Sequence, residues 1–509
     1  MPSWPLSTEL LRWSPRDRWT LEHACLGSLI TGAIGSGKTS GPFQYVIRSF
    51  LRAGFGGIFF CAKVDAAKEY LELAAKEGRS KDVIRFRPGD HGFNFLTYEA
   101  RRPGAGKAII ENILLILMQA AEVASRKHGN RAGDDFFEEA MKQLLRNCLH
   151  LVIITTGGVD LGVILEIVQS LPQRRNDLEE PEKFRSLQIL AEAERKATPD
   201  RAEEIKMARQ YITQAWPSLA DRTRSSIAIT LEVLLDSFMR YPLRDLLLGK
   251  TTVSPDDVLA GKLIVIDVAV KEFDLIGKIA GVIWKYSLQR AIERRPGLAD
   301  QSGGDSLRPI FIAADEAQFW ASSSDTLFQT TARNARGLTV YATQNLPNFY
   351  AEMGGDGAGK ARVDSLLGNL QNRFACQNLE IQTNHWSAES IGKIIVKRKG
   401  KSVTHNYQGP DQYSIVARLA GMSRSVNESE SEQLDYDVQP RAFTGLLRGG
   451  QPNAFTVEAI LTSAGERFAF NNERWLKVSF DQRVSGNGSR SWFNQTTPQA
   501  SITAPRITE

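Results

Sequence analysis

Short apolar runs alternate with segments of helical apolar spacing near the start of the chain. The apolar runs at residues 26–31, 56–62 and 83–86 predict buried strands. The segments at 42–53 and 66–77, which lie between them, predict amphipathic helices. This order favours a parallel sheet with helices packed on its faces.

The middle of the chain changes to long helical patterns. Helical spacing occurs at residues 108–127, 134–153, 161–171, 201–216 and 222–238. Residues 173–200 are rich in charge and carry no strand pattern. We therefore expect an all-α domain, residues 125–245, that is inserted into an α/β domain.

Strand patterns resume after the expected insertion. Apolar runs lie at residues 262–269, 309–314, 338–343, 372–377 and 454–461, and a long helix is predicted at 275–295. The α/β domain should therefore combine residues 26–124 and 246–483. A lead-in of residues 1–25 precedes it. The tail of residues 484–509 is rich in Ser, Thr, Asn, Gln and Pro, and we expect it to be disordered.

The overall composition is that of an ordinary globular protein. The chain has 509 residues, of which 42% are hydrophobic and 24% are charged, so it can bury a large core. A formal net charge of +5 is small for this length and does not by itself indicate nucleic-acid binding. The four cysteines form no C-x-x-C pair, so neither a zinc site nor a disulfide framework is indicated.

No apolar stretch has the length of a membrane-spanning helix. The longest runs, residues 108–121 and 149–154, are too short, and the first contains Glu111 and Asn112. Residues 1–19 lack the apolar core of a signal peptide. The sequence therefore predicts a cytoplasmic protein.

A glycine-rich turn directly after the first predicted strand carries a phosphate-binding pattern. It has the form G-x-x-x-x-G-K-T, and its candidate nucleotide-binding residues are Gly32, Ala33, Ile34, Gly35, Ser36, Gly37, Lys38, Thr39 and Ser40. Glycines permit positive φ and close backbone approach, so N–H groups and a helix N-terminus can converge on a phosphate. Lys38 is expected to contact the β- and γ-phosphates, and Thr39 to bind Mg²⁺.

Polar side chains follow two later strands at positions that suit nucleotide hydrolysis. Asp315 and Glu316 end the run at 309–314, and Gln344 ends the run at 338–343. Asp315 is expected to bind Mg²⁺ through water, and Glu316 to activate the attacking water. Gln344 would sense the γ-phosphate or orient the water, the alternative being a structural cap of the strand end.

Two groups of basic residues have open roles. Arg333 and Arg336 precede the strand at 338–343, where an arginine of a ring subunit can reach a neighbour's γ-phosphate; surface ion pairing is the alternative. A second group either follows a nucleic-acid backbone or is a solvated hairpin tip. Its members are Lys393, Lys397, Arg398, Lys399 and Lys401, followed by His405 and Tyr407.

The order of these segments resembles that of the TraG/TraD-like type IV coupling proteins, conjugative DNA-transfer ATPases of the FtsK/HerA superfamily. Residues 31–40 look like the family's Walker A motif, 313–318 like its Walker B motif, and 333–346 like its Arg-to-Gln segment. Residues 367–372 and 387–392 are similar to the stretch around the TraM-recognition region, which we place at about 310–430.

Three departures from the family pattern are visible. Residues 60–65 stand where the family has Asp-Pro-Lys-Gly-Glu, and of that motif the lysine is retained as Lys63. Phe95 stands where the Asn-Pro-Leu signature has its proline. Typical members also begin with transmembrane helices, for which this sequence has no counterpart.

The resemblance implies a RecA-like P-loop ATPase with ATP and Mg²⁺ as ligands. It also implies that Arg333 is the arginine that acts in trans, because its spacing to Gln344 fits the family's segment. It further implies a homo-oligomeric ring, as a hexamer, that moves DNA. Relaxase or secretion-channel proteins are implied partners, and one of them could hold the chain at the inner membrane. Two alternatives remain: a superfamily ATPase that acts on proteins or in defence, and a nucleotide-gated adaptor that hydrolyses ATP slowly.

Overall fold

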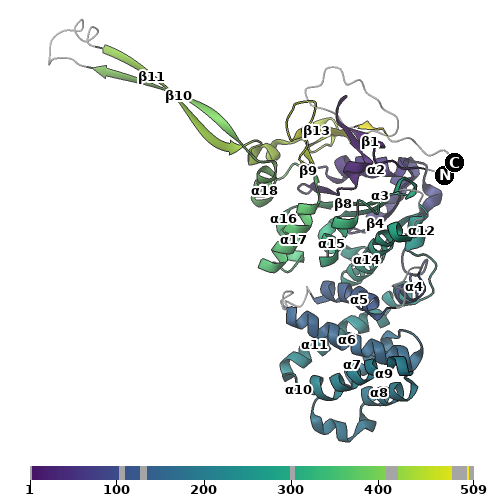
Figure 1. The fold of residues 1–509 in the computed structure, drawn as a ribbon. Coiled ribbons are helices and arrows are strands. Elements are labelled where there is room, and N and C mark those ends of the chain that lie inside the picture. Colours follow the sequence, from purple (N-terminus) through teal and green to yellow (C-terminus); the bar gives the residue numbers. More distant parts are fainter. Residues whose placement is uncertain are drawn as a thin grey trace.

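A nine-stranded sheet forms the centre of the molecule (Figure 1). The computed structural model describes residues 3–102, 109–125, 135–298, 304–407, 422–483 and 501–503. The strands lie in the order β13-β12-β9-β3-β8-β7-β4-β6-β5. Their bounds are β3 Ser28–Thr31, β4 Gly56–Phe60, β5 Val83–Phe86, β6 Leu263–Ile266, β7 Ile310–Asp315, β8 Gly337–Thr343, β9 Asn372–Cys376, β12 Thr456–Ser463 and β13 Leu476–Asp481.

The sheet is mostly parallel, as the sequence predicts. All neighbours from β9 to β5 pair in parallel, and β12 pairs antiparallel with both β9 and β13. The predicted strands from residue 26 to residue 461 are confirmed, whereas β13 was not expected. Position 57 of β4 has room only for glycine, because a Cβ on Gly57 would lie 2.3 Å from the Phe311 ring of the neighbouring strand β7. The fold is thus the expected α/β class, with the carboxyl ends of its parallel strands at one edge.

Two apolar cores cover the two faces of this sheet. Successive side chains of a strand point to opposite faces, so Phe59 packs into one core and Phe60 into the other. The helices of the α/β region that flank the sheet are α2 Gln44–Arg52, α3 Ala66–Lys76, α4 Phe95–Arg101, α12 Pro255–Leu259, α13 Val270–Phe273, α14 Leu275–Leu298, α15 Ser323–Thr331, α16 Leu346–Glu352, α17 Gly357–Asn369 and α18 Ile381–Ile391. The long helix expected at 275–295 is therefore confirmed as α14.

A stack of helices lies beyond one face of the sheet (Figure 1). These helices are α5 Ile110–Ser125, α6 Asp135–Thr156, α7 Leu161–Gln169, α8 Arg185–Lys196, α9 Ala202–Gln210, α10 Trp216–Ser218 and α11 Asp221–Met239. Helix α5 packs against α14 on one side and against α6 on the other, so apolar packing is continuous between the stack and the sheet. The expected helices are confirmed and α8 is additional, while the domain boundaries at 125 and 245 stay predictions.

The lead-in forms part of a small three-stranded sheet. Strands β1 Glu9–Arg12 and β2 Arg18–Thr20 pair antiparallel, and β14 Ser501–Ile502 adds to β1. The expectation of disorder is therefore wrong for the short segment 501–502, where a β-branched residue pairs with a strand edge. The rest of the expected tail, 484–500 and 504–509, lies outside the described residues.

A long two-stranded ribbon projects from the sheet end of the molecule (Figure 1). It consists of β10 Lys393–Tyr407 and β11 Met422–Tyr436, which pair antiparallel. Helix α18 leads into β10, and the short helix η11 Pro440–Gly445 follows β11 and packs against α18.

Two findings concern the membrane helices and the cysteines of the described residues. No helix among them is long and apolar enough to cross a membrane. Cys25, Cys61, Cys148 and Cys376 are buried and are not joined in disulfides. Burial raises the pKa of Cys25 to about 11 and that of Cys148 and Cys376 to about 12, so these thiols stay protonated at neutral pH.

Candidate active site

The glycine-rich turn after β3 lines a cavity of about 540 Å³ at the carboxyl edge of the sheet. Gly35 and Gly37 have φ values of +72° and +82°, which L side chains rarely adopt. A Cβ on Gly37 would also lie 2.4 Å from Val457 Cγ2. Residues Ala33, Ile34, Gly35, Ser36, Gly37, Lys38, Thr39 and Ser40 line the cavity. Gly32 lies beneath it, where a Cβ would come within 2.5 Å of Ser36 Oγ.

Thr39, which lines this cavity, contacts Asp315 just behind the lining, although 276 positions separate the two residues in the chain. The Thr39 hydroxyl donates a hydrogen bond of 2.8 Å to Asp315 Oδ2. The other carboxylate oxygen, Asp315 Oδ1, is buried and has no hydrogen-bond partner among the described residues. A hydroxyl beside a carboxylate with an unpartnered buried oxygen suits Mg²⁺, which prefers oxygen ligands and binds through one or two carboxylates plus substrate phosphates.

Glu316 lies next to Lys38. Its Oε1 is 3.5 Å from Lys38 Nζ, and both side chains are buried. Gln344 donates a hydrogen bond of 2.9 Å to Glu316 Oε1, and Gln318 donates one of 2.9 Å to Glu316 Oε2. The backbone of Glu316 has φ +64°, a left-handed conformation that turns the chain sharply after β7.

These neighbours decide the charge of the Glu316 carboxyl. Burial alone would raise its pKa, but Lys38 and the amides of Gln344 and Gln318 together hold the pKa of Glu316 below its ordinary value. Glu316 is therefore an ionised carboxylate at neutral pH. An ionised carboxylate in such a cavity can accept a proton from water.

Gln318 is a site residue that the sequence analysis missed. Its side chain is buried, and Thr343 donates a hydrogen bond of 3.0 Å to its Oε1. Gln318 thereby links the end of β8 to Glu316. In the sequence, Gln318 is only a polar residue two positions after an acidic strand end. Polar residues are common at such positions in exposed turns, so this pattern does not identify a site residue.

Charged residues from the loop after β4 and from α3 form the outer wall of the cavity. They are Lys63, Glu69, Glu72 and Lys76. Lys63 is the lysine retained in the family comparison, and the other three were not expected. Burial and the nearby Asp65 carboxylate raise the pKa of Glu69.

Arg333 lies apart from this cavity in its own chain. It precedes β8 at the amino edge of the sheet, whereas Gln344 follows β8 at the opposite edge. Its side chain is half exposed and forms an ion pair of 2.5 Å with Glu22. Arg336 is buried and pairs with Asp305 at 2.8 Å. Any contact of Arg333 with nucleotide must therefore involve a second chain.

The basic group at 393–401 lies on the ribbon, and its charges are balanced. Lys397, Lys399 and Lys401 face three glutamates of β11 at 3.2–3.4 Å. Arg398 pairs with Asp435 at 3.3 Å. The side chains of His405 and Tyr407 lie outside the described residues. Cross-strand pairing thus makes the basic group part of an electrically neutral ladder and not a uniformly positive surface.

Comparison with known proteins links this fold to solved coupling-protein structures. No protein-family model matches the sequence, and no curated protein matches it. An unbound form of the bacterial conjugative coupling protein TrwBdeltaN70 aligns with 94% of this chain and 92% of its own, at 14% identity and a TM-score of 0.55.

Two nucleotide complexes of the plasmid coupling protein TrwB are equally similar. The complex with a non-hydrolysable ATP analogue covers 96% of this chain and 92% of that one, at 13% identity and a TM-score of 0.55. The complex with ADP and Mg²⁺ covers 93% and 89%, at 13% identity and a TM-score of 0.54. The chain therefore shares, over nearly its whole length, the fold of the conjugative coupling protein TrwB: a RecA-like P-loop α/β domain with a helical region.

Proposed function

We propose that this chain is an ATPase whose hydrolysis drives the movement of DNA. The observation that carries the proposal is the convergence of Lys38, Glu316 and Gln344 on one cavity, with Asp315 hydrogen-bonded to Thr39 of its lining. The cavity of about 540 Å³ is large enough for a nucleotide.

Each side chain has a position that suits one part of ATP hydrolysis. Lys38 would bind the β- and γ-phosphates and neutralise the charge that develops on them. Glu316 would accept a proton from water as the water oxygen attacks the γ-phosphorus and the bond to the ADP oxygen breaks. Gln344, already hydrogen-bonded to Glu316, would orient that water.

Thr39 and Asp315 are the residues that would hold Mg²⁺. Bound Mg²⁺ would offset the negative charge of the β- and γ-phosphates. The Thr39 hydroxyl, which donates to Asp315 here, would turn its oxygen toward the metal. Asp315 Oδ1, buried without a partner among the described residues, would accept a hydrogen bond from metal-bound water.

The proposal of a motor function is supported by the fold that the chain shares with TrwB and by the arrangement of side chains around the cavity. TrwB is a conjugative coupling protein, and its solved complexes contain nucleotides. We propose that copies of this chain form a ring, as a hexamer, with Arg333 of one copy completing the site of the next. The expected cargo is DNA or nucleoprotein, and relaxase or secretion-channel proteins are the proposed partners.

DNA-dependent ATP hydrolysis tests this proposal. Phosphate release is measured with and without single- and double-stranded DNA at several salt concentrations, for the wild type and for Lys38→Ala. We expect DNA to stimulate the wild type and the stimulation to fall with rising salt, because phosphate contacts release counterions. The Lys38→Ala variant should be inactive with and without DNA.

The same measurement separates the alternatives. Hydrolysis that depends on Lys38 but not on DNA would contradict the DNA motor and favour an ATPase that acts on proteins. A very slow rate that no nucleic acid stimulates would favour the nucleotide-gated adaptor. Wild-type turnover by Lys38→Ala would refute the assignment of the site itself.

A further inference from the structure

The ribbon of β10 and β11 is long, and no second layer from the described part of the chain covers its outer length (Figure 1). Its strands pair without interruption from Lys393 opposite Tyr436 to Tyr407 opposite Met422. At about 3.3 Å per residue, its 15-residue strands extend about 50 Å. A two-stranded hairpin is marginally stable in water on its own, so a ribbon of this length gains stability when one face is covered.

One face of the ribbon carries an ordered series of cross-strand pairs. Directly opposite residues share a face, and alternate pairs return to it. Outward from the body, this laddered face consists of Ile395 with Leu434, Lys397 with Glu432, Lys399 with Glu430, Lys401 with Glu428, and Val403 with Val426. Ile395 and Leu434 are 64% and 63% exposed, so the inner end of this face presents an apolar pair to solvent.

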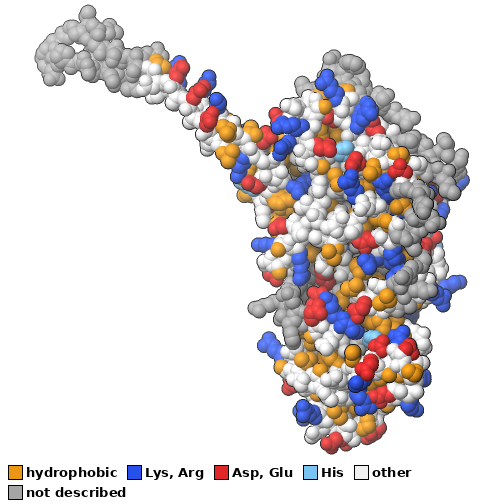
Figure 2. Space-filling view, in the orientation of Figure 1, with side chains coloured by type: hydrophobic (Ala, Val, Ile, Leu, Met, Phe, Trp, Pro, Cys, Tyr) orange, Lys and Arg blue, Asp and Glu red, His pale blue; other side chains and the backbone are white. Residues whose placement is uncertain are grey.

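The charges of the laddered face are sorted by strand. All three lysines lie on β10 and all three glutamates on β11, and the paired nitrogen and oxygen atoms are 3.2–3.4 Å apart. Along the ribbon, positive and negative side chains lie beside each other without a run of either sign (Figure 2). The opposite face lacks this order, since Arg398 lies opposite Ser431 and Ser402 opposite Asn427.

We propose that the laddered face binds the same face of a second copy of this chain. A half-turn about an axis parallel to the strands places β10 of one copy over β11 of the other. Every lysine then faces a glutamate of the partner copy, and each apolar pair faces the same apolar pair. Stacked sheets pack about 10 Å apart, a gap that lysine and glutamate side chains can bridge.

Charge favours the half-turn parallel to the strands over a half-turn across them and over nucleic acid as the occupant. A half-turn about the in-plane axis across the strands would again match apolar pairs but would place lysines over lysines, which is repulsive. Nucleic acid is disfavoured as the occupant because the three lysines and three glutamates give the laddered face no net charge. An isologous contact between two copies therefore fits the pattern best.

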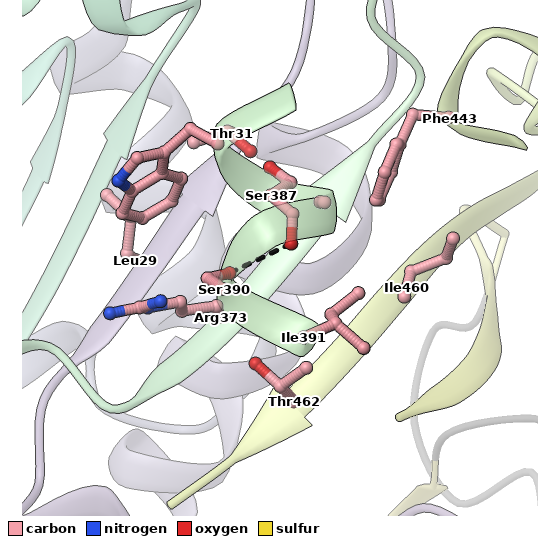
Figure 3. Close-up of a pocket in the computed structure, with 11 residues that line it drawn as sticks. Leu29, Thr31, Arg373, Ser387, Ser390, Ile391, Phe443, Ile460 and Thr462 are labelled. Carbon is pink, nitrogen blue, oxygen red and sulfur yellow. Dashed lines mark hydrogen bonds between the residues drawn. The ribbon is translucent and has the colours of Figure 1, made fainter. Parts of the chain in front are cut away.

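The base of the ribbon is packed against the body through α18 and η11. Helix α18 packs on the sheet beside β9 and β12, and only a very small cavity of about 10 Å³ remains between them (Figure 3). Arg373, Ile391, Phe443 and Ile460 line that cavity from both sides, and Ser390 donates a hydrogen bond to the carbonyl of Ser387.

Exchanging the two charged columns gives a direct test. The column-exchange variant combines Lys397→Glu, Lys399→Glu and Lys401→Glu with Glu428→Lys, Glu430→Lys and Glu432→Lys. It keeps every ion pair within one ribbon, so folding of the hairpin is preserved. Two exchanged copies remain complementary, whereas an exchanged copy and a wild-type copy would place lysine over lysine and glutamate over glutamate.

Association is measured by energy transfer between full-length chains. Ser402→Cys, on the opposite face, carries the donor or the acceptor, since the native cysteines are buried. Matched pairs, wild type with wild type or exchanged with exchanged, should associate equally. Mixed pairs should associate at least about tenfold more weakly, because favourable charge contacts become repulsive. In a control exchange on the opposite face, Arg398→Asp with Asp435→Arg, mixed pairs should associate as well as matched pairs.

Two results would overturn the proposal. One is equal association of mixed and matched pairs, which would mean that the copies are held together by contacts other than the proposed stacking of the laddered faces. The other is an absence of association between wild-type chains. ATP hydrolysis by each variant, measured in parallel, tests the nucleotide site separately, since this inference does not depend on the proposed function.

Discussion

Replacing Glu316 with glutamine isolates the proton-accepting role that we propose for its carboxylate. The amide keeps the shape of the side chain but carries no charge and cannot accept a proton from water at neutral pH. In the wild type, Glu316 Oε1 receives the Gln344 amide at 2.9 Å and lies 3.5 Å from Lys38 Nζ. The substitution therefore removes the base and also frees Lys38 from a competing anion.

The expected loss follows from the usual contribution of general-base catalysis. A positioned base contributes about 10²- to 10⁴-fold in rate, which corresponds to about 3–5 kcal/mol of activation free energy. ATP binding should be unchanged or tighter, because the lysine no longer shares its charge with a carboxylate at 3.5 Å. The Glu316→Gln variant should thus bind ATP and hydrolyse it very slowly.

Two measurements check this prediction together. Single-turnover phosphate release gives the chemical rate, and a fluorescent ATP analogue gives the affinity. Turnover within about threefold of the wild type would refute the role of Glu316 as the base. Loss of both binding and turnover would indicate a structural role of Glu316 instead.

The pH profile offers an independent check on the same carboxylate. Lys38, Gln344 and Gln318 hold the pKa of Glu316 below its ordinary value despite burial, so the base stays ionised as the pH falls from neutral. Wild-type turnover should therefore hold its plateau to about pH 5, near the upper end of ordinary glutamate titration. A decline already near neutral pH that depends on Glu316 would contradict this charge state.

Three further substitutions test other parts of the account. Asp315→Asn should raise the Mg²⁺ concentration needed for half-maximal turnover by about tenfold, as removal of a carboxylate that orients the metal's ligand sphere commonly does; an unchanged Mg²⁺ titration would contradict its role. Arg333→Ala should lower turnover by at least about 10³-fold if the arginine acts in trans. Mixing Arg333→Ala chains with Lys38→Ala chains should then restore part of the activity. No recovery on mixing would contradict a contribution in trans. Glu77→Ala should lower the free energy of unfolding by about 3–5 kcal/mol, measured by urea denaturation, because the buried Glu77 pairs with Arg48 at 2.5 Å and with Arg52 at 2.6 Å; an unchanged midpoint would contradict this estimate.

The P-loop and the ends of β7 and β8 could be predicted because their signals are local. An apolar run predicts a buried strand, and parallel strands end at the same edge of a sheet, so Asp315 and Gln344 were expected near Lys38 without any knowledge of the loops between them. Gln318 could not be assigned in this way, because its role depends on the left-handed backbone of Glu316 and on Thr343, 25 residues later.

A hairpin was one of two interpretations of the basic group, but the length of the ribbon could not be predicted, because its stability comes from pairs and not from either strand alone. Residues 422–436 contain serines and charged residues that are typical of loops, and β-propensity disfavours them. The glutamates at 428, 430 and 432 become strand residues because each lies opposite a lysine of β10. The basic group also looked uncompensated in the sequence, because the glutamates that pair with its lysines lie more than twenty residues away in the chain.

Movement along DNA would distinguish a DNA motor from an ATPase that only binds DNA. A third strand bound to a DNA duplex reports translocation when a motor displaces it, and its release can be followed by fluorescence with wild-type protein and ATP. The account predicts ATP-dependent displacement that stops with a non-hydrolysable analogue and with Glu316→Gln. Active ATP hydrolysis without any displacement, on both single- and double-stranded tracks, would contradict the proposed DNA motor.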